Sequence, residues 1–329
     1  MARIVRFHEL GGPEVLKIEE VELPPPGPGE VAIEIKALGI NRAESMFRSG
    51  PYVETPRFPA RLGYEAAGVV TALGADVSGI EVGDAVSVIP PLSITRWGSY
   101  GDRGVFPAKV VVKHPASLSW IEAAAIWMQY VTAYGALLEF ARLKEGEAVL
   151  ITAASSSVGL AAIQVANLIG ARPIAATRTS SKKSALLQAG AADVIAFEEE
   201  NLVERIARIT NGVGVRVAFD PVVGPLLEQI AEAMAQDGII IEYGALSPDP
   251  ALLPLFPILA KNLTLHGYQY KEVVRNDAAR ERARDFILDG LASGRLNPII
   301  DKVFPFDRIV DAHRYLESND QFGKIVVTV

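Results

Sequence analysis

The chain has 329 residues, of which half are hydrophobic and 22% are charged, and its formal net charge is −7. This length favours two domains, and no apolar stretch approaches the roughly 20 residues that a membrane helix needs. An acidic chain is a poor partner for nucleic acid, because neutralising a phosphate backbone requires an excess of Lys and Arg on one face.

Cysteine is absent from the sequence, which excludes disulfides and every thiolate-ligated metal site. The four histidines show no spacing typical of a helical metal-binding pair, so we expect no metal site. Residues 1–7 contain neither an apolar h-region nor a small-residue cleavage site. We therefore expect no signal peptide and a cytoplasmic protein.

The first 124 residues have the pattern of a β-rich domain. Short β-branched runs within 31–37, 66–74 and 82–88 predict strands, and Pro and Gly at 24–29 interrupt them. This pattern favours a small barrel. Ser119 with Glu122 three residues later is typical of a capped helix start, so we expect a helix to lead from here into the second domain.

From about 125 to 265 the pattern alternates between strand and helix. Strands are predicted at 148–153 and 172–177 with a helix from Ser157 to Ile169 between them, and further strands at 193–196, 215–220 and 238–243. Such βαβ alternation predicts an α/β fold with a Rossmann-type, doubly wound parallel sheet. Beyond Leu265 the sequence predicts an amphipathic helix over about 277–293 and a terminal strand at 324–329.

A candidate phosphate loop lies between the strand at 148–153 and the following helix. The dinucleotide-binding pattern G-x-G-x-x-G places Ala154 and Ser156 at its first two glycine positions and keeps only Gly159, which permits close packing of helix on strand. Backbone N–H groups at a helix N-terminus can still receive a pyrophosphate, and serine hydroxyls add donors. An ordinary serine-capped helix remains the alternative interpretation.

The end of the next strand indicates which nicotinamide cofactor would be bound. An NAD site places Asp or Glu there to hold the ribose 2′-OH, but no acidic residue occurs between Glu147 and Asp193. Instead the turn carries hydroxyls and cations, among them Thr177, Arg178, Ser180 and Lys182. Arg and Lys suit a 2′-phosphate, which favours NADPH. A solvated turn leading into the next helix is the alternative.

These features resemble the medium-chain dehydrogenase/reductase superfamily, specifically its zinc-independent quinone oxidoreductase branch, over nearly the whole chain. The matching segments are Gly39-Ile40-Asn41, 48–52, Gly63-Tyr64-Glu65 with 66–68, Thr132-Ala133-Tyr134 and the helix start at 157–162. The resemblance implies a GroES-like, barrel-type catalytic domain from 1–124 and 266–329, a Rossmann domain at 125–265, a cleft for NADPH, and commonly a homodimer.

Zinc-dependent members of the superfamily hold their catalytic zinc by Cys, His and Cys, and the resemblance places Asn41, Tyr64 and Met128 at those positions. None of the three is a competent zinc ligand in that geometry. Without a Lewis acid, the enzyme should not act as an ordinary alcohol dehydrogenase. A conjugated acceptor such as a quinone or enone can spread the incoming charge itself, so the resemblance implies hydride transfer from NADPH to such an acceptor.

The resemblance also implies roles for individual residues. Asn41 would orient the nicotinamide ribose or the substrate oxygen, Tyr52 would offer its phenol to the developing oxyanion, and Tyr64 would line the same pocket. The further cofactor contacts implied are Thr132, Ser156, Ser157, Val158, Phe197, Val222, Tyr243, Gly244 and Lys324.

Two other functions stay open. An NADPH-dependent enoyl or alkenal reductase would use the same chemistry on another acceptor; a bulky acyl carrier would need a basic patch, which Arg42, Arg48, Arg57 and Arg61 could form. A nucleotide-binding protein without turnover is the second alternative, because two of the three glycines are missing.

Overall fold

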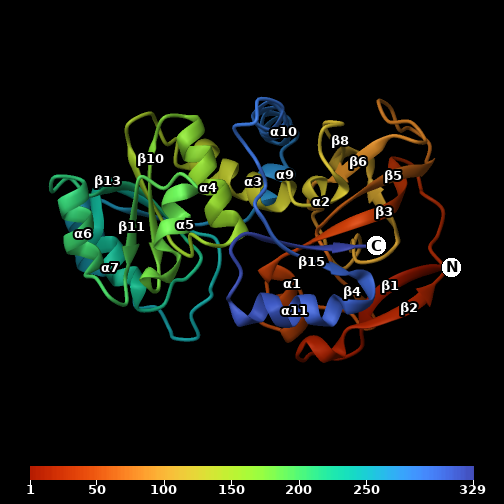
Figure 1. The fold of residues 1–329 in the computed structure, drawn as a ribbon, viewed down its shortest axis with the longest axis horizontal. Helices are drawn as coiled ribbons and strands as arrows, with labels where there is room; N and C mark the ends of the chain where they lie inside the picture. The colour runs from red at the N-terminus through yellow and green to blue at the C-terminus, as the bar shows by residue number, and fades with distance from the viewer. The chain divides into compact units, whose positions relative to one another are not determined.

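The computed structural model describes residues 1–329, which form two compact units. Unit 1 comprises residues 1–128 and 298–329, and unit 2 comprises residues 129–297. Figure 1 shows both chain termini within unit 1. None of the helices is long and apolar enough to cross a membrane.

Unit 1 is built mainly from β-strands. Its strands are β1 (Ala2–Phe7), β2 (Lys17–Val21), β3 (Glu30–Ile40), β4 (Ala60–Arg61), β5 (Glu65–Leu73), β6 (Ala85–Val88), β7 (Arg103–Pro107), β8 (Val111–Lys113), β15 (Ile300–Pro305) and β16 (Lys324–Thr328). Its helices are α1 (Arg42–Ser49), α2 (Trp120–Ala123) and α11 (Ile309–Ser318), with 3₁₀ turns η1 (Pro13–Val15), η2 (Ala108–Val110) and η5 (Phe306–Arg308).

The long strand β3 organises unit 1. Its side chains alternate between buried and half-buried along most of its length, as expected for a strand with one face in the core. β3 pairs antiparallel with β5, β7 and β16 in a sheet of order β15-β16-β3-β5-β6-β8, and a second sheet has the order β2-β1-β4. The C-terminal strand β16 thereby lies beside β3, as Figure 1 shows (blue beside red).

Unit 2 is a Rossmann-type layer structure. Its six strands are β9 (Ala148–Ile151), β10 (Arg172–Thr177), β11 (Asp193–Ala196), β12 (Val215–Asp220), β13 (Met234–Glu242) and β14 (Thr264–Gly267). All are parallel, in the order β11-β10-β9-β12-β13-β14. The strand order reverses between β9 and β12, which is where doubly wound sheets bind their ligands.

Helices connect these strands, and Figure 1 shows several of them around the sheet. They are α3 (Trp127–Tyr134), which contains the boundary between the units and continues as a π-helix (Gly135–Phe140), α4 (Ser157–Leu168), α5 (Lys183–Gln188) after the 3₁₀ turn η4 (Ser180–Lys182), α6 (Leu202–Ile209), α7 (Leu226–Ala233), α8 (Leu255–Lys261), α9 (Lys271–Val274) and α10 (Asp277–Ala292). The apolar faces of α6 and α7 close a core with Leu150, Ile174 and Ile240 from the sheet.

The predicted elements are confirmed, and the fold is α/β, with a Rossmann-like unit and a β-rich unit. The capped helix start at Ser119 is also confirmed, because the Ser119 hydroxyl accepts from the Glu122 N–H. The division of the chain differs from expectation at residues 266–297. These residues belong to unit 2, because β14 completes the parallel sheet and α9 and α10 follow it there.

Candidate active site

The predicted phosphate loop joins β9 to α4 in unit 2. Ser156 caps α4, since its hydroxyl accepts from the Gly159 N–H at 3.1 Å. A Cβ at Gly159 would lie 2.7 Å from the Ala154 Cα, so only glycine lets the helix start approach the loop this closely. The N–H groups of Ser157 and Val158 are in the first helical turn and have no carbonyl acceptor within the helix. The loop therefore suits an anion, as the sequence predicted.

The turn after β10 brings together several of the predicted cofactor contacts. The Phe197 N–H donates to the Thr177 carbonyl oxygen at 3.0 Å, which joins this turn to the end of β11. Lys182 reaches back toward the phosphate loop, with Nζ 3.5 Å from the Ser155 hydroxyl. The Arg178 side chain is exposed and forms no ion pair. A 2′-phosphate would find a cation here.

An acidic residue also reaches this turn, although the intervening sequence gave no sign of it. The Glu199 carboxylate accepts from the Ser180 N–H at 3.0 Å. Ser180 therefore offers its hydroxyl, but not its amide, to a ligand. Glu199 follows the next strand, so only the pairing of β10 with β11 brings it beside Ser180.

The loops after β12 and β13 meet at the carboxyl edge of the sheet. Buried Asp220 accepts from the Val222 N–H at 2.9 Å and from the Val223 N–H at 2.8 Å, and also from the Thr152 hydroxyl. These bonds hold Val223 at a φ of 62°, which is strained for a β-branched residue. A loop that is held in a strained conformation by several hydrogen bonds, and that lies beside the strand-order reversal, is typical of a ligand site.

Tyr243 carries a buried hydroxyl at the same edge. Its ring stacks on Phe219 at a centroid distance of 4.0 Å. The hydroxyl lies near the Ser156 side chain but lacks a well-formed hydrogen bond, and burial raises the pKa of Tyr243 well above its usual value. An unsatisfied hydroxyl next to the phosphate loop fits a polar ligand group.

The other predicted contacts in unit 2 have clear packing roles. Val222 and Phe197 are half-buried and pack against the apolar core. Gly244 packs against Pro221, where a Cβ would lie 2.9 Å from the proline Cβ. Thr132 is a buried residue of α3.

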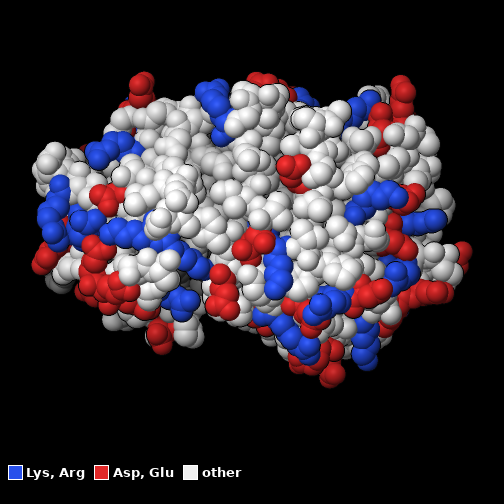
Figure 2. Space-filling model, in the orientation of Figure 1, with Lys and Arg blue, Asp and Glu red and all other residues white.

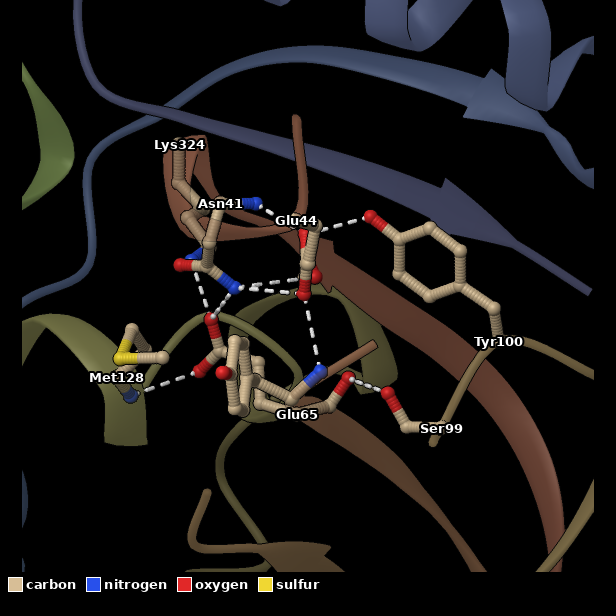
Figure 3. A network of polar contacts seen from close by, with 9 residues as sticks. Asn41, Glu44, Glu65, Ser99, Tyr100, Met128 and Lys324 are labelled. Carbon is tan, nitrogen blue, oxygen red and sulfur yellow. Dashed lines mark hydrogen bonds and ion pairs between the residues drawn. The ribbon is translucent and has the colours of Figure 1, made fainter. Parts of the chain in front are cut away.

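In unit 1, Asn41 precedes α1 and its amide is held from both ends. Nδ2 donates to Glu65 Oε1 at 3.2 Å and to Glu44 Oε1 at 3.3 Å, while Oδ1 accepts from Lys324 Nζ at 2.6 Å (Figure 3). Carboxylates only accept and an ammonium only donates, so these partners fix the amide orientation. One lone pair on Asn41 Oδ1 has no partner and could accept a hydrogen bond from a ligand. A ligand hydroxyl could donate to it, whereas a ligand carbonyl oxygen could not.

Lys324 does not fit the predicted role of a cofactor contact. Its side chain is 0% exposed and forms an ion pair with Glu65, which is 1% exposed. Because its side chain is fully buried and binds Glu65 and Asn41, Lys324 supports Asn41 and has no surface to offer a ligand. The Glu65 Oε2 atom also accepts from the Met128 N–H at 3.0 Å.

The two tyrosines predicted to act on the substrate are hydrogen-bonded to each other, with 2.6 Å between their Oη atoms. Tyr52 is half-buried, and burial raises its pKa to about 12, so its phenol stays protonated near neutrality. Tyr64 is completely buried. The Tyr64 hydroxyl therefore contacts the Tyr52 hydroxyl and has no exposed surface of its own.

Catalytic zinc does not fit the residues at the three ligand positions. The Asn41 amide is engaged by Glu44, Glu65 and Lys324, the Tyr64 phenol contacts Tyr52, and Met128 offers only a thioether. No group of three or more His, Cys, Asp or Glu residues is arranged to hold a metal ion.

Sequence reasoning missed the carboxylates that support this site. Glu44, Glu65 and Asp220 are all buried and all bind backbone N–H groups of the predicted site segments. One local signal existed: Asn41 followed by Glu44 has the spacing of a capping box, and the structure forms its return bond, in which the Glu44 carboxylate accepts from the Asn41 N–H at 2.6 Å.

Two family models match the chain. The model described as "Alcohol dehydrogenase GroES-like domain" matches residues 27–153, and that described as "Zinc-binding dehydrogenase" matches residues 157–287. The second match extends beyond residue 265, in agreement with the extent of unit 2.

Individual proteins match over the whole length. The quinone oxidoreductase of Lama guanicoe is 32% identical over 99% of this chain and 97% of its own sequence. The Escherichia coli quinone oxidoreductase, solved with NADPH, superposes with a TM-score of 0.90 at 31% identity and covers all of both chains. A structure named as an NAD-dependent alcohol dehydrogenase gives the same TM-score at 30% identity, again over both full chains. With its Rossmann-type unit, its β-rich unit and these full-length relatives, the chain belongs to the medium-chain dehydrogenase/reductase superfamily, in its quinone oxidoreductase branch.

Proposed function

We propose that this protein transfers hydride from NADPH to a quinone or another conjugated carbonyl, without zinc. The observation that carries the proposal is the donor set of unit 1. Where zinc-dependent relatives have metal ligands, this chain has an amide held by Glu44, Glu65 and Lys324 and a phenol paired with Tyr52. These groups can orient a ligand and donate a hydrogen bond, and they suit an acceptor that needs no Lewis acid.

Several residues fit NADPH. In unit 2 the N–H groups of Ser157 and Val158 suit the pyrophosphate, and Arg178 with Lys182 suits the 2′-phosphate. In unit 1 the remaining lone pair of Asn41 Oδ1 suits a ribose hydroxyl, which favours the first of the two roles that the sequence left open for this residue. The quinone oxidoreductase solved with NADPH supports the same cofactor.

NADPH supplies the hydride when it is bound, and the chain provides the polar contacts for the acceptor. Tyr52 keeps its proton at neutral pH because burial raises its pKa to about 12, so it can donate to the oxygen on which negative charge develops. When the Tyr64 hydroxyl donates to Tyr52, the Tyr52 proton is left for the acceptor and the two hydrogen bonds reinforce each other.

The reaction is tested by following NADPH absorbance with quinones, enones, enals and simple alcohols, with and without a chelator. We expect oxidation of NADPH by quinones or enones that the chelator does not change. Chelator-sensitive oxidation of ethanol would refute zinc-independent hydride transfer.

Cofactor preference is tested by the variant Arg178→Asp. Loss of the cation beside the 2′-phosphate should raise KM for NADPH at least tenfold, as expected for a lost charge-assisted contact, and should leave KM for NADH nearly unchanged. Equal effects on both cofactors would contradict the assignment of Arg178.

An acyl-carrier substrate finds less support, because three of the four arginines expected in a basic patch are bound to other groups of unit 1. Arg48 is buried in an ion pair with Glu317, Arg42 donates to the Leu316 carbonyl oxygen, and Arg61 donates to the Gly98 carbonyl oxygen. Figure 2 shows Lys and Arg interspersed with Asp and Glu over the face that it draws. The same substrate panel distinguishes the two remaining alternatives. An enoyl or alkenal reductase would prefer enones or enals to quinones, and a nucleotide-binding protein without turnover would oxidise NADPH with none of the acceptors.

The predicted homodimer is supported by an exposed edge of unit 2. β14 is the last strand of the sheet, and the nearby chain exposes large apolar side chains, with Leu252 82% and Phe256 83% exposed. A second copy of β14 could satisfy the unpaired backbone groups and cover these side chains. Sedimentation of the wild type should show a dimer, and the Phe256→Glu variant should be monomeric. A monomeric wild type would refute the homodimer. Cytoplasmic location stays a prediction.

A further inference from the structure

Glu44 is a buried carboxylate with no part in the proposed hydride transfer. Its side chain is 0% exposed and lies in the first turn of α1. Oε2 accepts from the Asn41 N–H and from the Tyr100 hydroxyl, both at 2.6 Å, while Oε1 accepts from the Tyr64 N–H at 2.9 Å and from Asn41 Nδ2 at 3.3 Å. Figure 3 shows these groups converging on the carboxylate.

These contacts join the two segments that carry the candidate active-site residues. Asn41 is the single residue between β3 and α1, and Tyr64 immediately precedes β5. Glu44 is hydrogen-bonded to the backbone of both segments, and Tyr64 in turn contacts the Tyr52 phenol. All the groups that face Glu44 in these bonds are donors, so a carboxylate matches them and an amide would place an N–H₂ group against a donor.

We propose that Glu44 is a positioning residue that holds Asn41, Tyr64 and, through Tyr64, the Tyr52 phenol in the geometry for hydride transfer. This inference rests on the proposed function, which assigns the ligand contacts to Asn41 and Tyr52. Glu44 itself is 0% exposed, so it has no surface that a ligand could contact.

The charge of Glu44 changes near neutral pH. Burial raises the pKa of Glu44 to about 7, whereas the pKa of buried His313 falls to about 3 and that of Tyr52 rises to about 12. The ionisable groups around Glu44 are Lys324, Glu65, Tyr52 and Tyr100, with His313 and Arg48 behind Tyr100. Because the hydrogen bonds to Glu44 are charge-assisted only when it is ionised, its hold on Asn41 and Tyr64 weakens as the pH falls through about 7.

The first experiment compares Glu44→Gln with wild type, using NADPH and p-benzoquinone across pH 5.5 to 9. We expect kcat at pH 8 to fall about tenfold or more, because misplacing reacting groups by a fraction of an ångström lowers the rate steeply. The wild-type loss of kcat below about pH 7 should be absent in the variant. The Kd for NADPH should stay within about threefold, because its proposed phosphate contacts belong to unit 2 and the variant disturbs only the Asn41 contact to the ribose.

Glu122→Gln is the matched control. Glu122 makes the same local capping contact at α2, accepting from the Ser119 N–H at 2.8 Å, but it lies at the surface and has no link to Asn41 or Tyr64. This variant should keep the wild-type kcat and pH profile. If Glu44→Gln behaves like Glu122→Gln, the positioning role is overturned.

Tyr100→Phe tests the same role if Glu44→Gln does not fold. The Tyr100 hydrogen bond lowers the pKa of Glu44, so its removal should move the acid limb of kcat to higher pH without abolishing it. An acid limb at its wild-type position in Tyr100→Phe would contradict the assignment of that limb to Glu44.

Amide hydrogen exchange separates this inference from the proposed function, because it needs no turnover. Peptides that contain the Asn41 and Tyr64 N–H groups should exchange faster in Glu44→Gln than in Glu122→Gln. If none of the tested acceptors supports oxidation of NADPH by the wild type, the proposed function is refuted, but the exchange comparison still tests the positioning role. Unchanged exchange at both amides in Glu44→Gln overturns the positioning role whatever the activity.

Discussion

The buried ion pair of Lys324 with Glu65 gives the sharpest test of the structure of unit 1. The two side chains are 0% and 1% exposed, and Lys324 Nζ also donates to Asn41 Oδ1 at 2.6 Å. Lys324→Met keeps much of the volume and removes the cation. The Glu65 carboxylate is then left buried with two neutral donors, Asn41 Nδ2 at 3.2 Å and the Met128 N–H at 3.0 Å.

Removing one partner of a buried ion pair typically costs about 3–5 kcal/mol of unfolding free energy, because the remaining charge is uncompensated. With a urea dependence of about 2 kcal/mol per molar for a unit of this size, the midpoint of unfolding should fall by roughly 2 M. Neutralising the orphaned anion should recover part of the loss. The double variant Glu65→Gln with Lys324→Met should therefore be more stable than Lys324→Met alone.

Tryptophan fluorescence during urea unfolding measures this effect selectively, because Trp97, Trp120 and Trp127 are the only tryptophans and all lie in unit 1. Lys113→Met is the control, since the Lys113–Asp84 pair is at the surface and its loss should leave the midpoint unchanged. A midpoint shift for Lys324→Met no larger than for this control would refute the reasoning.

Three further variants test the site. Tyr52→Phe should lower kcat for p-benzoquinone about 100-fold, as for a lost oxyanion donor, with the NADPH Kd unchanged in fluorescence titration; an unaltered kcat would exclude Tyr52 as the donor. Gly159→Ala should lower the melting temperature and weaken NADPH binding, because its Cβ would lie 2.7 Å from the Ala154 Cα; wild-type values for both would count against the loop geometry. Burial and the charge of Asp220 raise the pKa of Glu242 from 4.5 to about 9, so the folded chain retains a proton that the unfolded chain loses. Stability should fall as pH rises from about 4.5 toward 9, and Glu242→Gln should raise the melting temperature at pH 8 more than at pH 4.5; equal changes at both would contradict this.

Local patterns account for the parts of the structure that were predicted correctly. The strand at 215–220 and the helix at 157–168 are each specified by side chains close together in sequence, and Ser156 and Gly159 set the helix start within four residues. The compact unit extends to residue 297 and not to 265, because α9 and α10 pack with unit 2 and their sequence pattern does not indicate which unit they join.

By itself the sequence determined the βαβ unit, the helix start that suits a phosphate, the basic turn at Arg178 and the absence of thiolate ligands. Those features depend on residue type and short spacing. The tertiary structure alone decided that Lys324 supports Asn41 from 283 positions away and that the Tyr64 hydroxyl is hydrogen-bonded to the Tyr52 hydroxyl. Such contacts depend on the register of β16 against β3 and on which side chains remain buried when the sheets of unit 1 pack, and no local spacing encodes either.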